Sequence, residues 1–408
     1  MFKKLTSLFL ILIFAASVSY GSGFQINEHG ARAMGMAGAF AGLANDPSAL
    51  YFNPAGMTQL KGTHILAGVT FISPSSTFAG PSPLTTEYKM EKQLFTPINF
   101  YITHQLTEDL FVGLGINNQY GLGTKWSDNF VGKFVAYDTE IRTFFFTPTV
   151  AYKVSEKLSL SAGLVFAWGD VRIAKFAPLS PTLSGKVTLK GDGTAWGFTA
   201  GALYRPIDEL QLGLSVRSQA KFSFSGDATS EAPAPYLPYL PSGSITAEVT
   251  TPLNVTFGAA VFASKDLTLT ADFQYVGWSS YDKLAVDFAT YPDQSTPRDY
   301  QNNFIIRAGA EYKATNELTL RGGLLYDKNP VKDELVDPTL PDADRIGFNV
   351  GIGYKLTQNL SIDAAYLLLS FSDRTITNSQ IVYAGTAKLN GTYTSIAHLI
   401  GFNLSYNF

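Results

Sequence analysis

Residues 355–366 read KLTQNLSIDAAY: a short polar turn, a leucine, and then apolar and polar side chains in strict alternation. Ile362, Ala364 and Tyr366 fall on one side of this alternation, and Asp363 falls on the other. A period of two residues is typical of a β-strand with one apolar face. The same unit recurs at Gln105–Ile116, Lys153–Leu164, Arg205–Val216, Ala263–Phe273 and Lys313–Leu324. Each copy follows another alternating run, so the unit predicts a β-hairpin with a short connection.

The connections between these hairpins are much longer than the turns within them. They cover residues 75–92, 122–138, 173–191, 226–243, 281–300, 328–343 and 373–391. Short turns at one end and long loops at the other are typical of outer-membrane β-barrels. We count fourteen alternating runs from residue 62 onward, an even number, as a single-chain barrel with both ends on the periplasmic side requires. We therefore predict an all-β fold, a 14-stranded antiparallel transmembrane β-barrel over residues 62–408.

The two faces of the predicted strands differ in charge. The run at residues 209–225 places Leu212 and Leu214 on one face, and Arg217 and Lys221 on the other. By the same parity, the charged face also carries Arg307, Arg321, Glu248, Asp272, Glu311 and Asp363. A soluble β-sandwich alternates in the same way. In a barrel the apolar face contacts lipid and the charged face lines the lumen, because a lysine or arginine facing lipid at mid-depth costs about 2–4 kcal/mol.

Aromatic residues at strand ends favour a membrane barrel over a soluble sandwich. Tyr101 and Tyr152 are two of several tyrosines that we place in the aromatic belts at the membrane interfaces. The last strand ends the chain with Phe402, Tyr406 and Phe408 on one face. A terminal aromatic on an alternating strand is similar to the assembly signal of outer-membrane barrels. We therefore expect the barrel assembly machinery to recognise Phe408, and we expect a monomer surrounded by outer-membrane lipid.

The composition excludes several classes of protein. Charged residues make up 15% of the 408 residues, below the roughly 25% usual for soluble globular proteins. The net charge of -3 provides no basic surface for nucleic acid. The chain has no cysteine and only four histidines, and it contains neither a Gly-x-Ser-x-Gly elbow nor a phosphate-binding loop. We therefore expect no enzymatic activity, no cofactor and no metal site.

Residues 1–21 predict a signal peptide. Lys3 and Lys4 precede the apolar run LFLILIFAA at residues 8–16, and Ser19 and Gly21 are small enough for a cleavage site. The apolar run is far shorter than the about 20 residues that a spanning helix needs. We therefore expect export to the cell outer membrane.

Residues 22–61 differ from the rest of the chain because they do not alternate. Ala31–Ala44 is rich in alanine and glycine, and Asp46 and Asn53 each precede a proline, as helix N-caps do. A fourteen-stranded barrel encloses a lumen too wide for its own side chains to fill. We therefore predict that residues 22–61 form a small, partly helical hatch inside the lumen. A flexible periplasmic tail is the alternative, although such tails are usually more polar.

Several motifs in chain order resemble the FadL/TodX type of outer-membrane transporter, which takes up long-chain fatty acids and hydrocarbons. The resemblance covers essentially the whole mature chain. Its motifs are GFQINE at residues 23–28, NPAGM at 53–57, YGLGTKW at 120–126, LPD at 340–342 followed by Asp344 and Arg345, and GIGY at 351–354. The resemblance implies a fourteen-stranded barrel, an N-terminal hatch, and release of hydrophobic molecules sideways through a gap beside a kink in the third strand.

The resemblance also implies roles for particular residues. Gly23 and Phe24 correspond to the gating segment that plugs the ligand pocket. The hatch motif corresponds to Asn53, Pro54 and Ala55. The kink and its lateral opening fall at Asn117, Asn118, Tyr120 and Gly121. The sequence itself is consistent with a kink, because polar residues interrupt the alternation there and glycine permits a bend. An ordinary strand end is the alternative reading of these residues.

Two of the predicted external loops are apolar, which is unusual for exposed loops and typical of binding grooves. We expect them to capture the ligand through Phe176, Leu179, Leu183, Tyr236, Leu237, Tyr239 and Leu240. Arg217 or Arg321 is our candidate cation for a ligand carboxylate. We therefore expect passive transport of hydrophobic small molecules, with the choice between fatty acid and uncharged hydrocarbon left open. An aqueous porin or a structural barrel is the alternative function.

Overall fold

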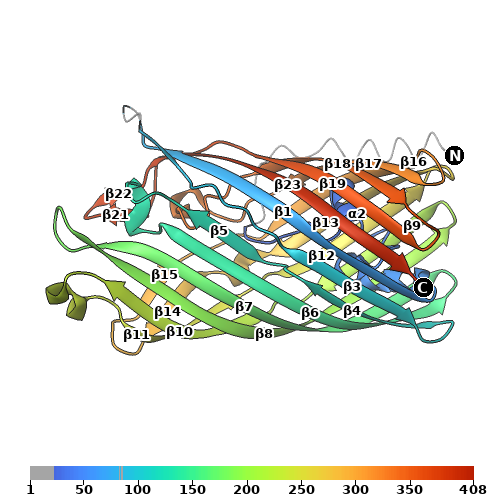
Figure 1. Cartoon of the computed structure of the whole chain (residues 1–408), viewed down its shortest axis with the longest axis horizontal. Helices are drawn as coiled ribbons and strands as arrows, with labels where there is room; N and C mark the ends of the chain where they lie inside the picture. The colour runs from blue at the N-terminus through green and yellow to red at the C-terminus, as the bar shows by residue number, and fades with distance from the viewer. Residues whose placement is uncertain (1–22, 82, 84–85) are drawn as a thin grey trace.

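The computed structural model describes residues 23–81, 83 and 86–408, and it has the form of a long closed barrel (Figure 1). Fourteen antiparallel strands of the described chain make up the wall. The first strand pairs with the last along its whole length, from His64 opposite Asn407 to Ala79 opposite Thr392. The predicted fold class is therefore confirmed. The predicted signal peptide at residues 1–21 lies outside the described residues.

Several wall strands are divided into two labelled segments. The first half of the wall contains β1 (Thr63–Ala79), β2 (Glu87–Lys89), β3 (Ile98–Gln105), β4 (Leu110–Asn117), β5 (Gly121–Lys125), β6 (Asp138–Ser155), β7 (Leu158–Pro178), β8 (Ser184–Ile207), β9 (Leu210–Arg217) and β10 (Lys221–Glu231). The second half contains β11 (Gly243–Thr250), β12 (Leu253–Phe262), β13 (Leu267–Gly277), β14 (Lys283–Phe288), β15 (Gln294–Pro297), β16 (Asn303–Lys313), β17 (Leu318–Asp327), β18 (Arg345–Lys355), β19 (Leu360–Phe371), β20 (Arg374–Ile376) and β23 (Gly391–Asn407). The loops contain a separate hairpin, β21 (Val382–Ala384) with β22 (Ala387–Lys388), and the short helices η2 (Val131–Phe134), η3 (Ala234–Tyr239), η4 (Trp278–Ser280) and η5 (Asp333–Leu335).

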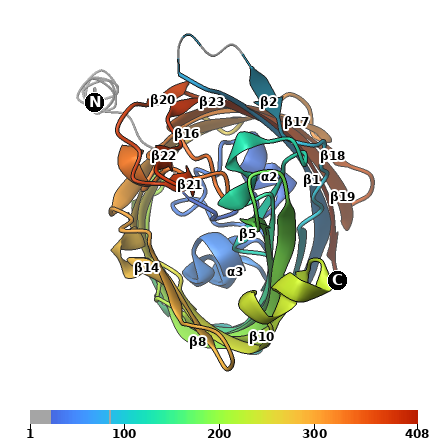
Figure 2. The ribbon, with the colours of Figure 1, turned by 90° about the vertical axis from the view of Figure 1, so that its left-hand side faces the viewer.

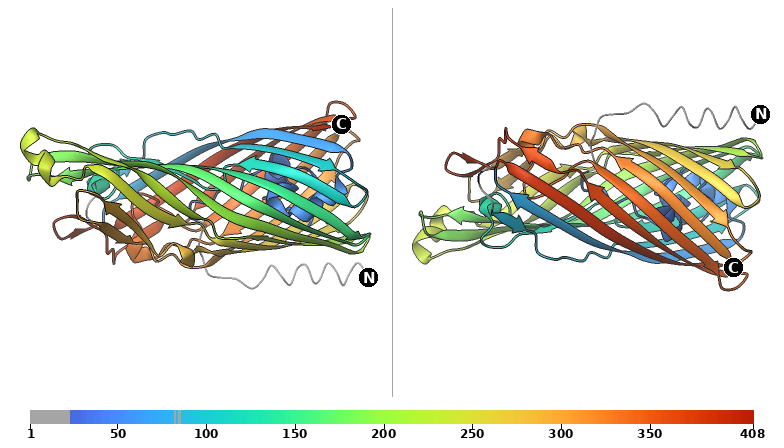
Figure 3. Two further views of the ribbon diagram at one scale, coloured as in Figure 1. Left: turned by 90° about the horizontal axis from the view of Figure 1, so that it is seen from below. Right: turned by 90° about the horizontal axis from the view of Figure 1, so that it is seen from above.

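The wall is much taller on one side, where β7, β8 and β10 project beyond the other strands (Figure 3). β7 and β8 pair without interruption from Leu158 opposite Tyr204 to Pro178 opposite Ser184. The prediction of a loop at residues 173–191 was therefore wrong, because only residues 179–183 form the connection. The apolar alternation of the two strands in fact continues through this stretch, with Ile173 and Leu189 on the inner face.

The predicted inner and outer faces of the strands are confirmed in the part of the wall nearer the short turns. Leu212 and Leu324 are exposed on the outer surface, whereas Asp272, Arg307 and Glu311 are buried on the lumen side. Tyr101 was wrongly placed in the aromatic belt, because its side chain is fully buried on the inner face.

The predicted inward orientation of Lys221 and Glu248 was wrong. Thr199 pairs with Arg217 in β9, but Thr194 pairs with Ser223 in β10, so the register shifts by one residue between the two segments. A shift of one residue exchanges the two faces of a strand. Lys221 and Glu248 therefore form an exposed ion pair at 2.8 Å.

The hatch lies inside the ring of strands (Figure 2). It contains α2 (Ala31–Gly35), α3 (Ala49–Phe52) and η1 (Pro54–Gln59). Its backbone contacts the wall so closely that glycine is required: a Cβ at Gly213 would lie 2.0 Å from the carbonyl oxygen of Ala41. No helix in the described ranges is both long enough and apolar enough to cross a membrane.

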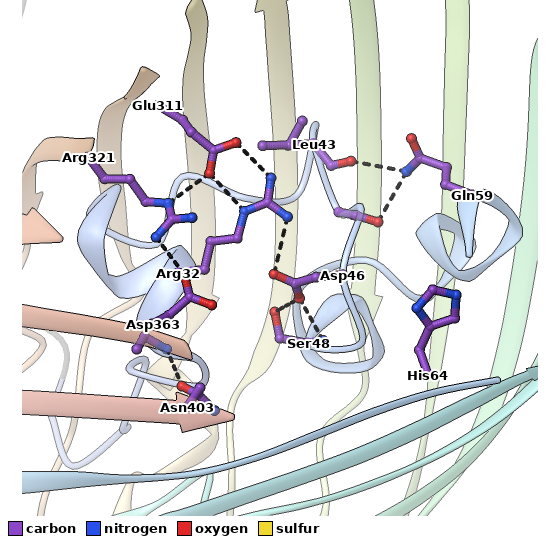
Figure 4. A network of polar contacts seen from close by, with 12 residues as sticks. Arg32, Leu43, Asp46, Ser48, Gln59, His64, Glu311, Arg321, Asp363 and Asn403 are labelled. Carbon is purple, nitrogen blue, oxygen red and sulfur yellow. Dashed lines mark hydrogen bonds and ion pairs between the residues drawn. The ribbon is translucent and has the colours of Figure 1, made fainter. Parts of the chain in front are cut away.

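A buried ion-pair network anchors the hatch to β16, β17 and β19 (Figure 4). The Nε and Nη2 atoms of Arg32 donate to the carboxylate of Glu311, each at 2.8 Å. Arg321 donates from Nε to Glu311 at 2.7 Å and from Nη1 to Asp363 at 2.6 Å. Asp46 of the hatch lies 3.5 Å from Arg32. Charged groups of the lumen face and of the hatch thus neutralise one another.

The C-terminal residue, Phe408, is 70% exposed at the end of the barrel that has the short turns. Its recognition by the assembly machinery stays a prediction, as does the monomeric state.

Candidate functional site

An apolar cavity, which we call cavity 1, lies within the tall side of the barrel. Its apolar lining comes from the inner faces of β6, β7, β8, β10, β11 and β14, and includes Ile141, Val171, Ile173, Leu189, Phe222, Phe224, Ile245 and Val286. Two charged residues border it. Lys190 is exposed on β8 between Leu189 and Gly191, whereas Arg298 is buried in an ion pair with Asp337. Cavity 1 can therefore accept an apolar molecule without desolvating an unpaired charge.

Phe24 closes the inner end of cavity 1. Its ring is 6% exposed and packs edge-on against Trp278 at 4.8 Å, Tyr281 at 5.8 Å and Tyr120 at 6.0 Å between ring centroids. Edge-to-face packing of aromatic rings is favourable at these separations. The hatch thus places one large apolar side chain at the floor of the cavity.

The residue before Phe24 is clamped by the loop that leads into β18. The Gly23 amide donates to Asp342 Oδ2 at 2.8 Å, and Arg345 donates to the Gly23 carbonyl at 3.3 Å. Burial raises the pKa of Asp342 above its ordinary value, and the nearby Arg345 guanidinium and the Gly23 amide oppose that rise. The backbone at Gly23 has φ +63°, and a Cβ there would lie 2.8 Å from the Trp278 ring, so glycine is required.

A second, larger cavity, cavity 2, adjoins the first on the other side of Phe24. Both cavities are lined by Phe24, Tyr120, Leu122, Ile141, Thr143 and Leu340. Cavity 2 is also lined by Ile26 and Arg307 of the interior, and by Arg142 and Leu94, which are well exposed on the outside. One continuous space therefore connects the interior with the outer surface of the wall.

The wall beside cavity 2 is interrupted by a bulge in the third strand. Asn117 of β4 pairs with Phe145, but Gly121 of β5 pairs with Arg142, so the third strand contains one more residue than β6 in this interval. An extra residue bends a strand and increases its twist. Figure 2 shows the result: β5 is displaced toward the interior of the ring while it stays paired with β6.

Side-chain amides and a threonine satisfy the backbone groups that the bulge leaves unpaired. Asn118 accepts from the Ile98 amide at 2.7 Å and donates to the Thr143 carbonyl at 2.6 Å, so it bridges β3 and β6. Thr143 Oγ1 accepts from the Tyr120 amide and donates to the Tyr120 carbonyl. Asn117 donates to the Tyr101 hydroxyl at 3.1 Å. A buried backbone group without such a partner would be costly.

The N-terminal arm of the hatch pairs directly with the bulge. The Ile26 amide donates to the Gln119 carbonyl at 2.9 Å, and the Gly121 amide donates to the Phe24 carbonyl at 3.0 Å. The same few residues thus close cavity 1 and complete the hydrogen bonding of the kink.

The other predicted hatch residues lie at the far side of the hatch. The Asn53 side chain donates to the carbonyls of Ala41 and Ala202 at 3.0 Å each, and it accepts from the Ala55 amide at the start of η1. Pro54 is the first residue of η1. Asn53, Pro54 and Ala55 therefore attach the hatch to β8.

The predicted loop residues do not line either cavity. Phe176 is a strand residue covered by Tyr137 and Lys133, at 4.9 and 4.8 Å. Leu179 and Leu183 lie at the tip of the β7–β8 hairpin. The remaining four lie on or beside η3, where Tyr239 is 76% exposed; they are Tyr236, Leu237, Tyr239 and Leu240.

The two predicted cations contact the hatch instead of a cavity. Arg217 lies over the Tyr51 ring at 4.2 Å and donates to the Tyr51 carbonyl. Arg321 belongs to the anchoring network with Glu311.

The sequence analysis did not identify the wall residues that line cavity 1 on the inner face. Two of them, Ile173 and Leu189, could have been found from the alternation that continues beyond residue 172. Among the described residues, no group of three or more His, Asp or Glu side chains is placed to hold a metal ion.

A protein-family model described as "Outer membrane protein transport protein (OMPP1/FadL/TodX)" matches residues 12–408. A 47 kDa outer membrane protein of Pasteurella multocida is 27% identical over 427 residues, covering 98% of this chain and 96% of that protein. A long-chain fatty acid transport protein of Escherichia coli is 24% identical and covers 96% of this chain and 95% of that protein.

Solved structures have the same fold. The crystal structure of a Pseudomonas aeruginosa FadL homologue has a TM-score of 0.85 at 22% identity, covering 95% of this chain and all of that one. The toluene transporter TodX of Pseudomonas putida has a TM-score of 0.72 at 19% identity, covering 96% of this chain and 99% of that one.

Proposed function

The chain belongs to the OMPP1/FadL/TodX family of outer-membrane transport proteins, and we propose that it carries hydrophobic small molecules, fatty acids or related hydrocarbons, from outside the cell into the outer membrane. The observation that carries this proposal is the pair of adjoining cavities, one with an apolar lining, the other reaching the outer surface of the wall. The family is described as one of transport proteins, which supports the expectation that the chain is not an enzyme.

In the proposed route the ligand enters cavity 1 from the tall side of the barrel. It passes into cavity 2 by displacing Phe24 and leaves at the bulge beside Asn118. The hatch closes the alternative route along the barrel axis, because Arg32 and Asn53 bind it to opposite parts of the wall. The predicted lateral opening at Asn117, Asn118, Tyr120 and Gly121 becomes, in this proposal, the exit.

The free energy of transfer favours a lateral exit. Each methylene group moved from water to an apolar environment gains about 0.8 kcal/mol. A twelve-carbon chain released into the periplasm would lose roughly 9 kcal/mol of that gain, whereas release into lipid keeps it. A passive transporter of such molecules therefore needs an opening toward the bilayer.

Ligand binding and opening are coupled in this proposal through the N-terminal arm. A ligand that displaces the Phe24 ring also strains the hydrogen bonds of Phe24 and Ile26 to Gly121 and Gln119. These bonds close one edge of the kink. Their loss frees the kink between β4 and β5 to move, while β5 stays paired with β6, so occupation of cavity 1 opens the exit from cavity 2.

Replacing Phe224 by alanine tests the binding site. Phe224 lines cavity 1 and stacks on Phe222 at 5.4 Å. We expect Phe224→Ala to weaken the binding of methyl laurate about tenfold, equivalent to about 1.4 kcal/mol of lost apolar contact. Equilibrium binding to the purified protein in detergent measures this. Phe402→Ala is the matched control, because Phe402 is exposed on the outer surface of β23.

The same assay tests the chemical class of the ligand. We expect methyl laurate to bind the parent protein at least as tightly as laurate, because the inward-facing cation among the described lining residues of cavity 1, Arg298, is already paired with Asp337. Clearly tighter binding of laurate would contradict the expected preference for an uncharged ligand and would point to recognition of a carboxylate. Equal affinity of the parent and Phe224→Ala for the ester would place the binding site elsewhere.

A further inference from the structure

A phenylalanine ring outside the hatch covers the glycine at the centre of β5. A Cβ built on Gly123 would lie 1.9 Å from Cζ and 2.3 Å from Cε1 of Phe95, so the ring rests directly on the Gly123 backbone. Phe95 belongs to the segment between β2 and β3, where it exchanges backbone hydrogen bonds with Ile72 of β1 at 2.8 and 2.9 Å. Its ring thus extends from the wall to the strand that the bulge has turned inward.

Backbone pairing across the wall is interrupted at this place. One end of the interval is closed by the Glu91 amide, which donates to the Lys125 carbonyl at 2.7 Å, and the other by the Ile98 amide bound to Asn118. Between these ends, no backbone hydrogen bond in the described chain joins residues 92–97 to residues 119–124. Side chains therefore close the interval, and a side chain can rotate in far less time than a strand needs to unpair.

Two bulky apolar side chains share this face of β5. Gly121 and Gly123 are two residues apart and so point to the same side. Ile26 of the hatch arm lies on Gly121, where a Cβ would be 2.8 Å from its Cδ1 atom, and Phe95 lies on Gly123. Leu122, between them, lines cavity 1. One closing side chain moves with the arm, and the other is independent of it.

We propose that Phe95 is a second gate, a ring that narrows the outer part of cavity 2 by resting on Gly123 and that must swing aside for a ligand to reach the bilayer. This inference rests on the proposed function, because it assigns a residue to the exit step of that route. Glycine at position 123 is required for closure, since any side chain would hold the ring off the strand. An apolar ring also suits the position, because it excludes water yet presents no polar group to a passing alkyl chain.

Two substitutions test the gate from its two sides. Phe95→Ala removes the ring, and Gly123→Ala places a methyl group where the ring rests. We expect either variant, reconstituted in phospholipid vesicles, to transfer methyl laurate into the bilayer several-fold faster than the parent. Binding at cavity 1 should be unchanged, and the double variant should be no faster than the faster single variant. Phe71→Ala is the control, because Phe71 faces outward on the neighbouring β1.

The outcomes separate this inference from the proposed function. A parent protein that transfers no more ester than protein-free vesicles would overturn the transport proposal itself. A functional parent whose Phe95→Ala variant transfers at the parental rate or more slowly would overturn the gate alone. Heat-modifiable gel migration confirms that each variant is folded, and Phe95→Ala decides the matter if Gly123→Ala fails to fold.

Discussion

Deletion of Gln119 is expected to abolish transfer of methyl laurate into the bilayer while folding and binding at cavity 1 persist. The bulge consists of one extra residue between Asn117 and Gly121 relative to β6. Removing one residue gives β4 and β5 a single register along β6. Leu122 and Thr124 stay on the inner side, because the deletion shifts their position in the sequence by one and so offsets the loss of the bulge. β5, which already pairs with β6, can then also pair along its other edge with residues 92–97, and the lateral exit no longer exists.

Gln119→Ala is the matched control for this deletion. It keeps the number of residues and therefore the bulge, and the hydrogen bond from Ile26 uses the backbone carbonyl of residue 119, which alanine also has. We expect Gln119→Ala to transport at nearly the parental rate in the same vesicle assay. Transport that survives the deletion would mean that the ligand leaves by another path, whereas loss of transport in both variants would point to the Gln119 side chain instead of the bulge.

The sequence predicted those features of the fold that repeat every two residues. The alternation in stretches such as Lys355–Tyr366 is local, so it shows both the number of strands and the face on which Asp363 lies. A single extra residue leaves no comparable signal. The shift between Arg217 and Lys221 reversed the predicted orientation of Lys221, because parity carried across the interruption gives the wrong face.

The site depends on contacts between distant parts of the chain, and these were harder to predict. The run Asn117–Gly121 was recognised as an interruption because its amides break the alternation. Its hydrogen-bond partner Thr143 lies more than twenty residues away, and nothing in the pattern identifies it. Phe95 is one of 30 phenylalanines, and its role becomes visible only where β1 and β5 bring it onto Gly123.

Removal of the Glu311 carboxylate is expected to loosen the hatch and to raise the ion conductance of the barrel. Glu311 accepts three hydrogen bonds, two from Arg32 of the hatch and one from Arg321 of the wall, which lie far from each other in the sequence. Removing one partner of a buried ion pair typically costs about 3–5 kcal/mol, because a charge remains without compensation. In Glu311→Ala, the ion pair that Arg32 keeps among the described residues is the longer one with Asp46, at 3.5 Å.

Conductance in planar bilayers is the direct measure of hatch release, because the barrel encloses a wide lumen that the hatch otherwise fills. We expect frequent open-channel events for Glu311→Ala and few for Glu317→Ala, the control, since Glu317 lies exposed in the next turn and contacts Thr315 of that turn.

The double variant Arg32→Met, Glu311→Met removes both charges of the pair and should restore closure in large part, because a buried ion pair can often be replaced by apolar residues without loss of stability. Parental conductance in Glu311→Ala would show that backbone contacts such as that of Ala41 with Gly213 hold the hatch without the ion pairs. Open channels in the double variant would show that the charges, and not only the packing, are needed to keep the lumen closed.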